Sequence, residues 1–274
     1  MTADVVGPDD VERFRRDGFV VLRGFYDVAG EIEPIRRGVH EIIGRVAEAH
    51  GVDLGERPYD PATFDAGYLR LKDVDRRLAG MVYDGVKQMA AFVRLVASPR
   101  NDELFRGLRQ ASLAGVAGGG SGIRIDNPGE TRYLAWWHQE YPAQGRSPGG
   151  TVLWSPLRPV GPETGPVEIL VGSHAEGVLA CVDDDDGTGR TGAYAMRLAD
   201  EAEVVARHVV TSASTEPGDL VVMDYLTVHR SGENRSDVSR WTMQMRYFAF
   251  DEPVGARRGW AGPPVDVTAE VGTR

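Results

Sequence analysis

Strand-like runs fill most of the second half of this 274-residue chain, and they are short and separated by Gly, Pro and Asn. The runs cover residues 112–117, 122–126, 131–140, 150–157, 167–171, 219–225 and 240–250. Many short strands with frequent turn residues are typical of a β-barrel or a β-sandwich. We therefore predict a mainly β fold for this half of the chain.

Helical periodicity is concentrated in the first part of the chain. Helices are predicted at residues 9–17, 34–50, 78–96 and about 102–109, with a strand at 19–22. No linker or repeat divides the sequence, so we expect a single domain over residues 1–274. It would comprise a helix-rich part (about 9–110), a β-barrel core (about 111–253) and an irregular tail (254–274). The helices are expected to flank a sheet.

The composition argues against several classes of partner. Lys and Arg number 31 against 41 Asp and Glu, a formal net charge of −10, and an acidic surface repels both nucleic acid and anionic lipid membranes. No apolar run approaches the roughly 20 residues that cross a bilayer. The single cysteine, Cys181, and an N-terminus without a signal pattern favour a reducing cytoplasm. The acidic run at 183–186 is expected to be an exposed loop, and the oligomeric state is not specified by the sequence.

A histidine and a carboxylate stand two residues apart in the aromatic run WWHQEYP at 136–142. If this run is a strand, His138 and Glu140 project from the same face, about 7 Å apart along the chain. They could then be two members of the 2-His-1-carboxylate set that binds non-heme iron(II). An H-x-E pair alone is equally consistent with a structural salt bridge, and a third ligand is needed. Among the six histidines His229 is the best candidate, because barrel closure could return it to His138 after the strand at 219–225.

The strand predicted at 240–250 alternates between a polar and an apolar face. The polar face carries Arg240, Thr242, Gln244 and Arg246, and the apolar face carries Trp241, Met243, Met245 and Tyr247. If the apolar face packs on the helices, Arg240 points into the barrel and needs an anionic partner there. A dicarboxylate co-substrate would supply that partner, because a guanidinium can bind a carboxylate through two N–H groups. A polar face in contact with solvent is the alternative.

These residues resemble the motifs of the phytanoyl-CoA dioxygenase family of iron(II)- and 2-oxoglutarate-dependent oxygenases. The matching segments are DGFVVL at 17–22, WHQE at 137–140, ETGP at 163–166, VGSH at 171–174, PGDLV at 217–221 and HRSGEN at 229–234, followed by Arg240. The resemblance covers most of the chain from Asp10 to Pro253. It implies a double-stranded β-helix, the cupin-like jelly-roll barrel, with helices packed on one sheet.

The resemblance also implies a set of site residues. His138, Glu140 and His229 would hold iron(II), Arg240 would bind the distal carboxylate of 2-oxoglutarate, and Ser231 would assist Arg240. Weaker matches add three residues to the co-substrate pocket: Gln139, Trp154 and Thr164. The family usually has aspartate where this chain has Glu140, which keeps the charge and adds one methylene.

The implied reaction is oxidation of a small-molecule substrate by dioxygen, by default a hydroxylation, with conversion of 2-oxoglutarate to succinate and CO2. Candidate substrate residues are Arg124, Tyr133 and Arg246. The two arginines could hold an anionic substrate group, or they could pair with surface carboxylates such as Asp126. Two other function classes stay open: a barrel that serves as a metabolite-binding module, and a metal-dependent hydrolase or isomerase on the same fold.

Overall fold

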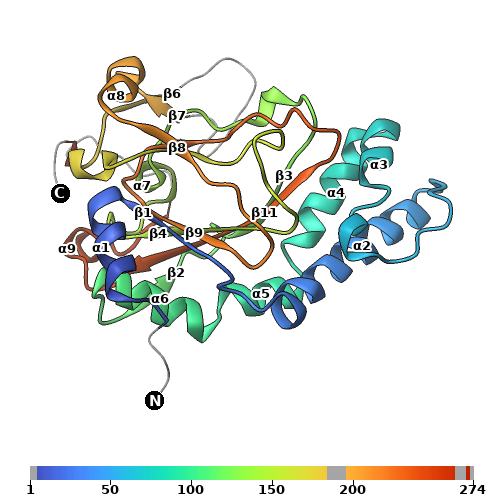
Figure 1. Cartoon of the computed structure of the whole chain (residues 1–274), viewed down its shortest axis with the longest axis horizontal. Coiled ribbons are helices and arrows are strands. Elements are labelled where there is room, and N and C mark those ends of the chain that lie inside the picture. Colours follow the sequence, from blue (N-terminus) through green and yellow to red (C-terminus); the bar gives the residue numbers. More distant parts are fainter. Residues whose placement is uncertain (1–4, 184–195, 263–269, 272–274) are drawn as a thin grey trace.

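A computed structural model describes residues 5–183, 196–262 and 270–271 of the chain. Its helices flank antiparallel sheets, as Figure 1 shows. The helices are α1 (Pro8–Asp17), α2 (Glu33–Ala49), α3 (Tyr68–Val74), α4 (Arg76–Val86), α5 (Ala90–Val96), α6 (Pro99–Arg109), α7 (Glu140–Gln144), α8 (Glu201–Arg207) and α9 (Pro253–Arg257). Shorter π- or 3-10 segments occur at Val28–Ile32, Pro61–Thr63, Thr131–Tyr133 and Ser173–Glu176.

The largest sheet is antiparallel and has the strand order β1-β9-β4-β11-β2, with β3 also paired to β11. Its strands are β1 (Phe19–Leu22), β2 (Ala114–Val116), β3 (Gly122–Asp126), β4 (Thr151–Pro156), β9 (Leu220–Asp224) and β11 (Arg240–Ala249). The long strand β11 pairs with β4 along one edge and with β3 and then β2 along the other. Strand β11 is therefore paired with three other strands of this sheet.

Two smaller sheets complete the β part of the described residues. One has the order β10-β5-β8 and the other pairs β6 with β7. Their strands are β5 (Glu168–Leu170), β6 (Cys181–Asp183), β7 (Met196–Leu198), β8 (Val210–Ser212) and β10 (His229–Arg230). The described strands therefore form separate antiparallel sheets, and their hydrogen bonds do not close into one continuous barrel.

Strand β11 places its two faces in different environments, as the alternation predicts. The apolar face is buried in one core with side chains from α2 to α6. The Trp241 ring, for example, lies edge-on to Phe64 and Tyr68, with ring centroids 5.8 and 4.9 Å away. Full burial of a large apolar side chain stabilises a fold by roughly 1.5–3 kcal/mol. The opposite face, with Arg240 and Arg246, lines a cavity.

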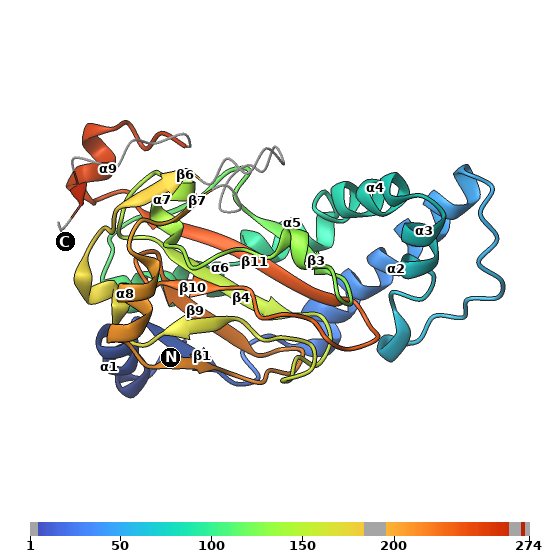
Figure 2. The same ribbon diagram turned by 90° about the horizontal axis from the view of Figure 1, so that it is seen from above.

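One of the predicted helices is interrupted in the structure. The helix predicted over 78–96 is divided into α4 and α5. Both helices pack on α2, and all three lie on the helical side of the sheet (Figure 2). The break lets the Met89 sulfur lie against Gly38, where an added Cβ would be only 2.3 Å from it. Apolar spacing continues across the break, so periodicity alone predicts one helix.

Helix α3 is not predicted by the sequence, and α9 begins just before the expected irregular tail. Asp183 ends β6, whereas 184–186, the rest of the acidic run, lie outside the described residues. In the described part of the chain no helix is both long enough and apolar enough to cross a membrane.

Candidate functional site

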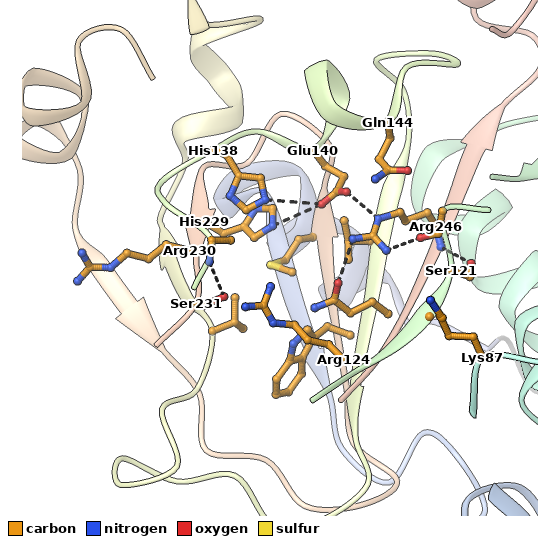
Figure 3. Close-up of a pocket in the computed structure, with 18 of the residues that line it drawn as sticks. Lys87, Ser121, Arg124, His138, Glu140, Gln144, His229, Arg230, Ser231 and Arg246 are labelled. Atoms are coloured by element: carbon orange, nitrogen blue, oxygen red, sulfur yellow. Dashed lines mark hydrogen bonds and ion pairs between the residues drawn. The ribbon is translucent and has the colours of Figure 1, made fainter. Parts of the chain in front are cut away.

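A cavity of about 330 Å³ lies against the inner face of the main sheet and strand β10. Figure 3 shows His138, Glu140 and His229 together, with Arg246 next to Glu140. The predicted site residues that line it are Arg124, His138, Glu140, Trp154, His229, Ser231, Arg240 and Arg246. Three other predicted site residues are not among the described residues that line the cavity: Tyr133, Gln139 and Thr164.

His138 and Glu140 face the cavity, but not because they share a strand. The strand predicted at 131–140 is wrong: Thr131–Tyr133 is a 3-10 turn, and Glu140 is the first residue of α7. His138 forms a single antiparallel bridge, in which its backbone N–H donates to the His229 carbonyl at 3.1 Å and its carbonyl accepts from the His229 N–H at 3.0 Å. The backbone N–H of Glu140 donates to the Tyr225 carbonyl at 2.9 Å. The three candidate ligands are thus brought together by backbone hydrogen bonds.

The position of His229 depends on the segment that contains the VGSH motif. Strand β10 pairs with β5, with His229 opposite Ile169. The Ser173 hydroxyl accepts from the Val228 N–H at 2.8 Å and donates to the Leu170 carbonyl at 2.8 Å. Ser173 therefore fixes the backbone immediately before His229.

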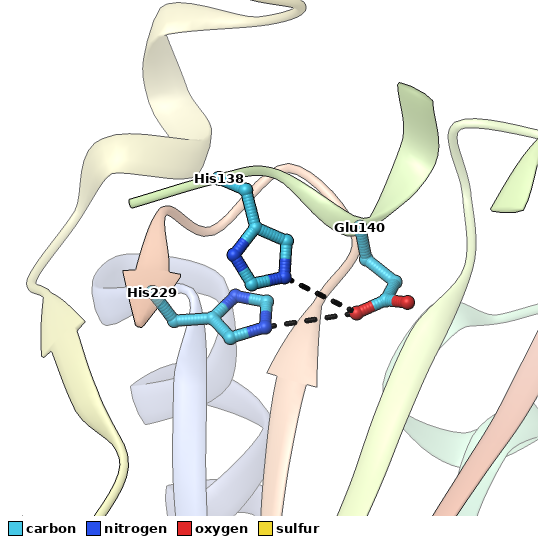
Figure 4. Close-up of side chains that lie close together, drawn as sticks. All are labelled: His138, Glu140 and His229. Carbon is cyan, nitrogen blue, oxygen red and sulfur yellow. Dashed lines mark ion pairs between the residues drawn. The ribbon is translucent and has the colours of Figure 1, made fainter. Parts of the chain in front are cut away.

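The two histidines present the same ring nitrogen to Glu140 (Figure 4). Nδ1 of His138 lies 2.7 Å from the Trp136 carbonyl, and Nδ1 of His229 lies 2.9 Å from the Thr227 carbonyl. Because a carbonyl only accepts, each Nδ1 carries the proton and each Nε2 offers a lone pair. The Nε2 atoms of His138 and His229 lie 4.0 and 3.6 Å from Oε2 of Glu140.

This donor set fits a divalent transition metal. One ligand atom from each of the three buried residues lies within 4.8 Å of the others. Two imidazole nitrogens and one carboxylate oxygen are the set used by non-heme iron(II) oxygenases. The backbone contacts of both Nδ1–H groups are the outer contacts that orient metal-binding histidines.

Burial and neighbouring charges set the protonation of this group. Burial, together with the nearby His229, lowers the pKa of His138 from 6.5 to about 3. Burial opposes ionisation of Glu140, but Arg246 and the two histidines outweigh it, so the pKa of Glu140 falls below its ordinary value. At neutral pH His138 is neutral and Glu140 is charged, as metal binding requires.

Arg240 is buried at the cavity wall, but its anionic partner belongs to the chain itself. Its Nη2 lies 2.8 Å from Oδ2 of Asp126, and its Nε donates to the same oxygen at 3.3 Å. Its Nη1 donates to the carbonyls of Thr164 and Gly232 at 3.2 and 3.0 Å. Arg240 therefore has an anionic partner within the chain, but that partner also pairs with Arg124, so one carboxylate faces two guanidinium groups.

Asp126 is shared between two arginines. Nε of Arg124 donates to both carboxylate oxygens of Asp126, at 2.7 and 2.9 Å. This is the alternative pairing that the sequence leaves open for Arg124, although Asp126 is buried and not at the surface. Burial opposes ionisation of Asp126, but Arg124 and Arg240 outweigh it and lower its pKa.

Residues 14–242 match the family described as Phytanoyl-CoA dioxygenase (PhyH). The match spans most of the chain and contains His138, Glu140, His229 and Arg240. The chain belongs to the phytanoyl-CoA dioxygenase family. This result confirms the predicted family and the predicted enzyme class, iron- and 2-oxoglutarate-dependent oxygenases. No curated protein matches the chain.

Several solved structures resemble this member of the phytanoyl-CoA dioxygenase family. EctD from S. alaskensis with bound Fe is 17% identical, with a TM-score of 0.60 over 100% of this chain and 89% of EctD. The non-heme alpha ketoglutarate dependent carbocyclase SnoK from nogalamycin biosynthesis is 19% identical, with a TM-score of 0.58 over 89% of this chain and 84% of SnoK. The epimerase SnoN in complex with Fe3+, alpha ketoglutarate and nogalamycin RO is 19% identical, with a TM-score of 0.54 over 97% of this chain and 94% of SnoN. At these identities the likeness establishes the fold, which confirms the predicted mainly β jelly-roll class with flanking helices.

Two residues that the family resemblance assigns to the co-substrate pocket make other contacts. The amide nitrogen of Gln139 donates to the carbonyls of Gly177 and Leu226 at 2.8 Å, and its oxygen accepts from Leu179 N–H at 2.8 Å. The hydroxyl of Thr164 bonds the backbone of Gly161, so Thr164 reaches Arg240 only through its own carbonyl.

The remaining predicted residues divide between the cavity and its surroundings. Trp154 and Ser231 line the cavity, and the Ser231 hydroxyl accepts from the Ala135 N–H at 3.3 Å. Tyr133 is 39% exposed and lies under the guanidinium of Arg76, 4.8 Å from its ring centroid. Arg246 contacts Glu140, and no sequence motif indicates this pair.

The sequence analysis missed part of the cavity wall. Tyr83 and Lys87 reach it from α4 and its C-terminal end, and Gln144 reaches it from α7. Helical periodicity identifies which face of a helix is apolar, but only the packing of α4 beside β3 brings Lys87 to the cavity. Burial of Glu140 indicates that a cation or several donors must contact its carboxylate, but it does not identify Arg246 as that partner.

Proposed function

We propose that this chain oxidises a small-molecule substrate with dioxygen, by default through hydroxylation, and converts 2-oxoglutarate to succinate and CO2. The observation that supports this proposal is the convergence of two oriented imidazoles and a carboxylate in one buried cavity. His138, Glu140 and His229 would hold iron(II), which when bound supplies the redox chemistry. The protein's share is to position the reactants and to exclude water.

Arg240 and Ser231 are the proposed site for the distal carboxylate of 2-oxoglutarate. Arg240 makes four polar contacts with the protein, whereas a guanidinium has five N–H donors. One N–H of Arg240 is therefore proposed for the ligand, in place of the two that a fork-like contact would use. Ser231 accepts a backbone N–H, so its own proton can be donated to the same carboxylate.

The substrate is proposed to enter beside α4 and the glycine-rich loop at 119–122. A cavity of about 330 Å³ suits a small molecule, and its wall here is polar. Lys87 and Arg124 are cations in this wall, with partners in Asp84 and Asp126. They are the proposed contacts for a polar or anionic substrate group. The single cysteine supports a reducing cytoplasm as the compartment.

Anaerobic titration of the metal-free protein with Fe(II) and then 2-oxoglutarate tests the proposal. Chelation of 2-oxoglutarate to the bound metal should produce a weak visible charge-transfer band. His229→Ala should bind less Fe(II) and give no band, and it should form no succinate in air. A wild-type protein with Fe(II) bound but no band would support the binding-module alternative, and undiminished turnover in His229→Ala would refute the ligand assignment.

A further inference from the structure

Arg246 contacts the candidate metal ligand Glu140 on the side away from His138 and His229 (Figure 3). Its Nε donates to Oε1 of Glu140 at 2.6 Å. Its Nη1 donates to the Gly120 carbonyl, and its Nη2 donates to Oε1 of Gln244 at 3.0 Å. The side chain of Glu140 is 1% exposed and that of Arg246 is 12% exposed. The contact is therefore a buried, charge-assisted hydrogen bond from a side chain that is fixed at three points.

The two oxygens of Glu140 have different partners. Oε2 faces Nε2 of His229 at 3.6 Å and Nε2 of His138 at 4.0 Å, whereas Oε1 faces Arg246. The carboxylate is thus divided into one oxygen turned to the candidate metal position and one oxygen bound by a cation. No such division follows from the H-x-E spacing alone.

This division matters because Glu140 is longer than the aspartate usual in the family. The added methylene gives the carboxylate one more rotatable bond, and Glu140 sits at the start of the short helix α7 rather than in a strand. A carboxylate that is free to turn can bind a metal through both oxygens. A second oxygen on the metal would occupy a position that the 2-His-1-carboxylate arrangement leaves open for reactants.

Charge points to the same role. A buried carboxylate loses most of its hydration and stays ionised only beside compensating groups. The Nε of Arg246, 2.6 Å from Oε1, is a cationic donor in contact with this buried carboxylate. An arginine suits this task, because its guanidinium is always protonated and its planar donors can hold several acceptors at once.

We infer that Arg246 is a positioning residue that holds Glu140 to one-oxygen ligation of the metal, and that it is not primarily a substrate-binding residue. This inference rests on the proposed metal site. It replaces the earlier assignment of Arg246 to an anionic substrate group, because the donors of Arg246 are directed at Glu140, Gly120 and Gln244.

The test is the affinity of the metal-free full-length protein for Fe(II), measured by anaerobic calorimetry without 2-oxoglutarate or substrate. Arg246→Met should weaken Fe(II) binding by about 10- to 100-fold, the range for loss of an outer contact to a metal ligand. Arg246→Lys should fall between Arg246→Met and wild type, because an ammonium can still donate to one oxygen of Glu140. Arg230→Met is the matched control, since Arg230 lines the same cavity but its guanidinium pairs with Glu168 at 2.6 Å, and the Fe(II) affinity of this variant should equal that of wild type.

A double-mutant cycle separates positioning of Glu140 from a general structural effect. In a Glu140→Ala background, Arg246→Met should change Fe(II) affinity by less than about twofold, because Arg246 no longer has a ligand to hold. An equal loss of affinity in both backgrounds would overturn the inference. If Arg246→Met does not fold, the same cycle with Arg246→Lys decides the question.

The outcomes for the inference and for the proposed function are distinguishable. A wild-type protein that binds no Fe(II) contradicts the proposed metal site itself. A wild-type protein that binds Fe(II) as tightly as Arg246→Met contradicts only the role of Arg246. In that second case a higher KM for the substrate in Arg246→Met than in wild type would restore the substrate-binding assignment of Arg246.

Discussion

The carboxylate of Asp126 lies 2.8 Å from Nη2 of Arg240 and also pairs with Arg124, and neither Asp126 nor Arg240 is more than 5% exposed. Asp126→Asn should therefore leave a buried guanidinium without its counter-charge. Removal of one partner from a buried ion pair costs about 3–5 kcal/mol. We expect urea unfolding to show a loss of this size in the free energy of unfolding. Asp84→Asn, which breaks an exposed pair with Lys87, should change it by less than about 1 kcal/mol.

The requirement for 2-oxoglutarate should distinguish Arg240 from Gln139. Arg240→Ala should raise the KM for 2-oxoglutarate by at least about tenfold, because loss of a buried charged contact costs 2 kcal/mol or more. Gln139→Leu should leave this KM within about twofold, since its amide bonds the backbone of Gly177, Leu179 and Leu226 outside the cavity. Gln139→Leu should instead lower the free energy of unfolding by about 2–3 kcal/mol, because it removes buried hydrogen bonds. A KM that rises equally in both variants would return Gln139 to the co-substrate pocket.

The metal-free protein should lose stability in mild acid because of His138. The pKa of this residue is about 3 in the folded chain against 6.5 ordinarily. Between these values the unfolded chain binds the proton and the folded chain does not, so the free energy of unfolding falls as the pH falls below 6.5. The contribution of His138 approaches about 1.4 kcal/mol per pH unit.

His138→Gln supplies the control for this pH dependence, because glutamine does not titrate. Urea unfolding in the presence of a chelator at pH 7.5, 6 and 5 should give a shallower pH slope for His138→Gln than for wild type. Identical slopes would show that His138 is not held neutral by the fold. Other groups that titrate in this range cancel in the comparison.

The backbone that holds Arg240 should not tolerate a side chain at Gly165. Gly165 has φ +72°, and an added Cβ would lie 2.3 Å from the Glu233 carbonyl oxygen. Gly165→Ala should lower the free energy of unfolding by at least about 2 kcal/mol, and a displaced Thr164 carbonyl should weaken 2-oxoglutarate binding. Gly161→Ala is the matched control, because no atom lies within 4 Å of a Cβ there. A well-folded Gly165→Ala with unchanged KM would show that this backbone contact is not needed.

Local patterns in the sequence predict the elements well where one face of an element meets the core. The alternation in β11 predicts both its apolar packing face and its cavity face, and β3 begins and ends at the predicted residues. Residues 131–140 are an exception, because their aromatic side chains suggest a strand. In the structure Glu140 begins a helix, and its N–H donates to the Tyr225 carbonyl. That contact comes from a residue far away in the chain, so no local pattern can report it.

The candidate site shows the same division between local and distant information. Motif resemblance identifies His138, Glu140, His229 and Arg240, and the structure brings them to one cavity. The partners of the charged groups could not be predicted, because Asp126 and Arg246 become neighbours of Arg240 and Glu140 only through strand pairing and the docking of α7.

Strand β11 carries Arg240 and Arg246 on the same face, six residues apart, so their Cα atoms are separated by roughly 20 Å. One regular strand, paired with β4 and β3, thus sets the distance between the proposed contact for 2-oxoglutarate and the proposed support of Glu140. Loops and α4 around the opening can be remodelled for a new substrate without altering that spacing. A slip of two residues in this strand would misplace both functions at once.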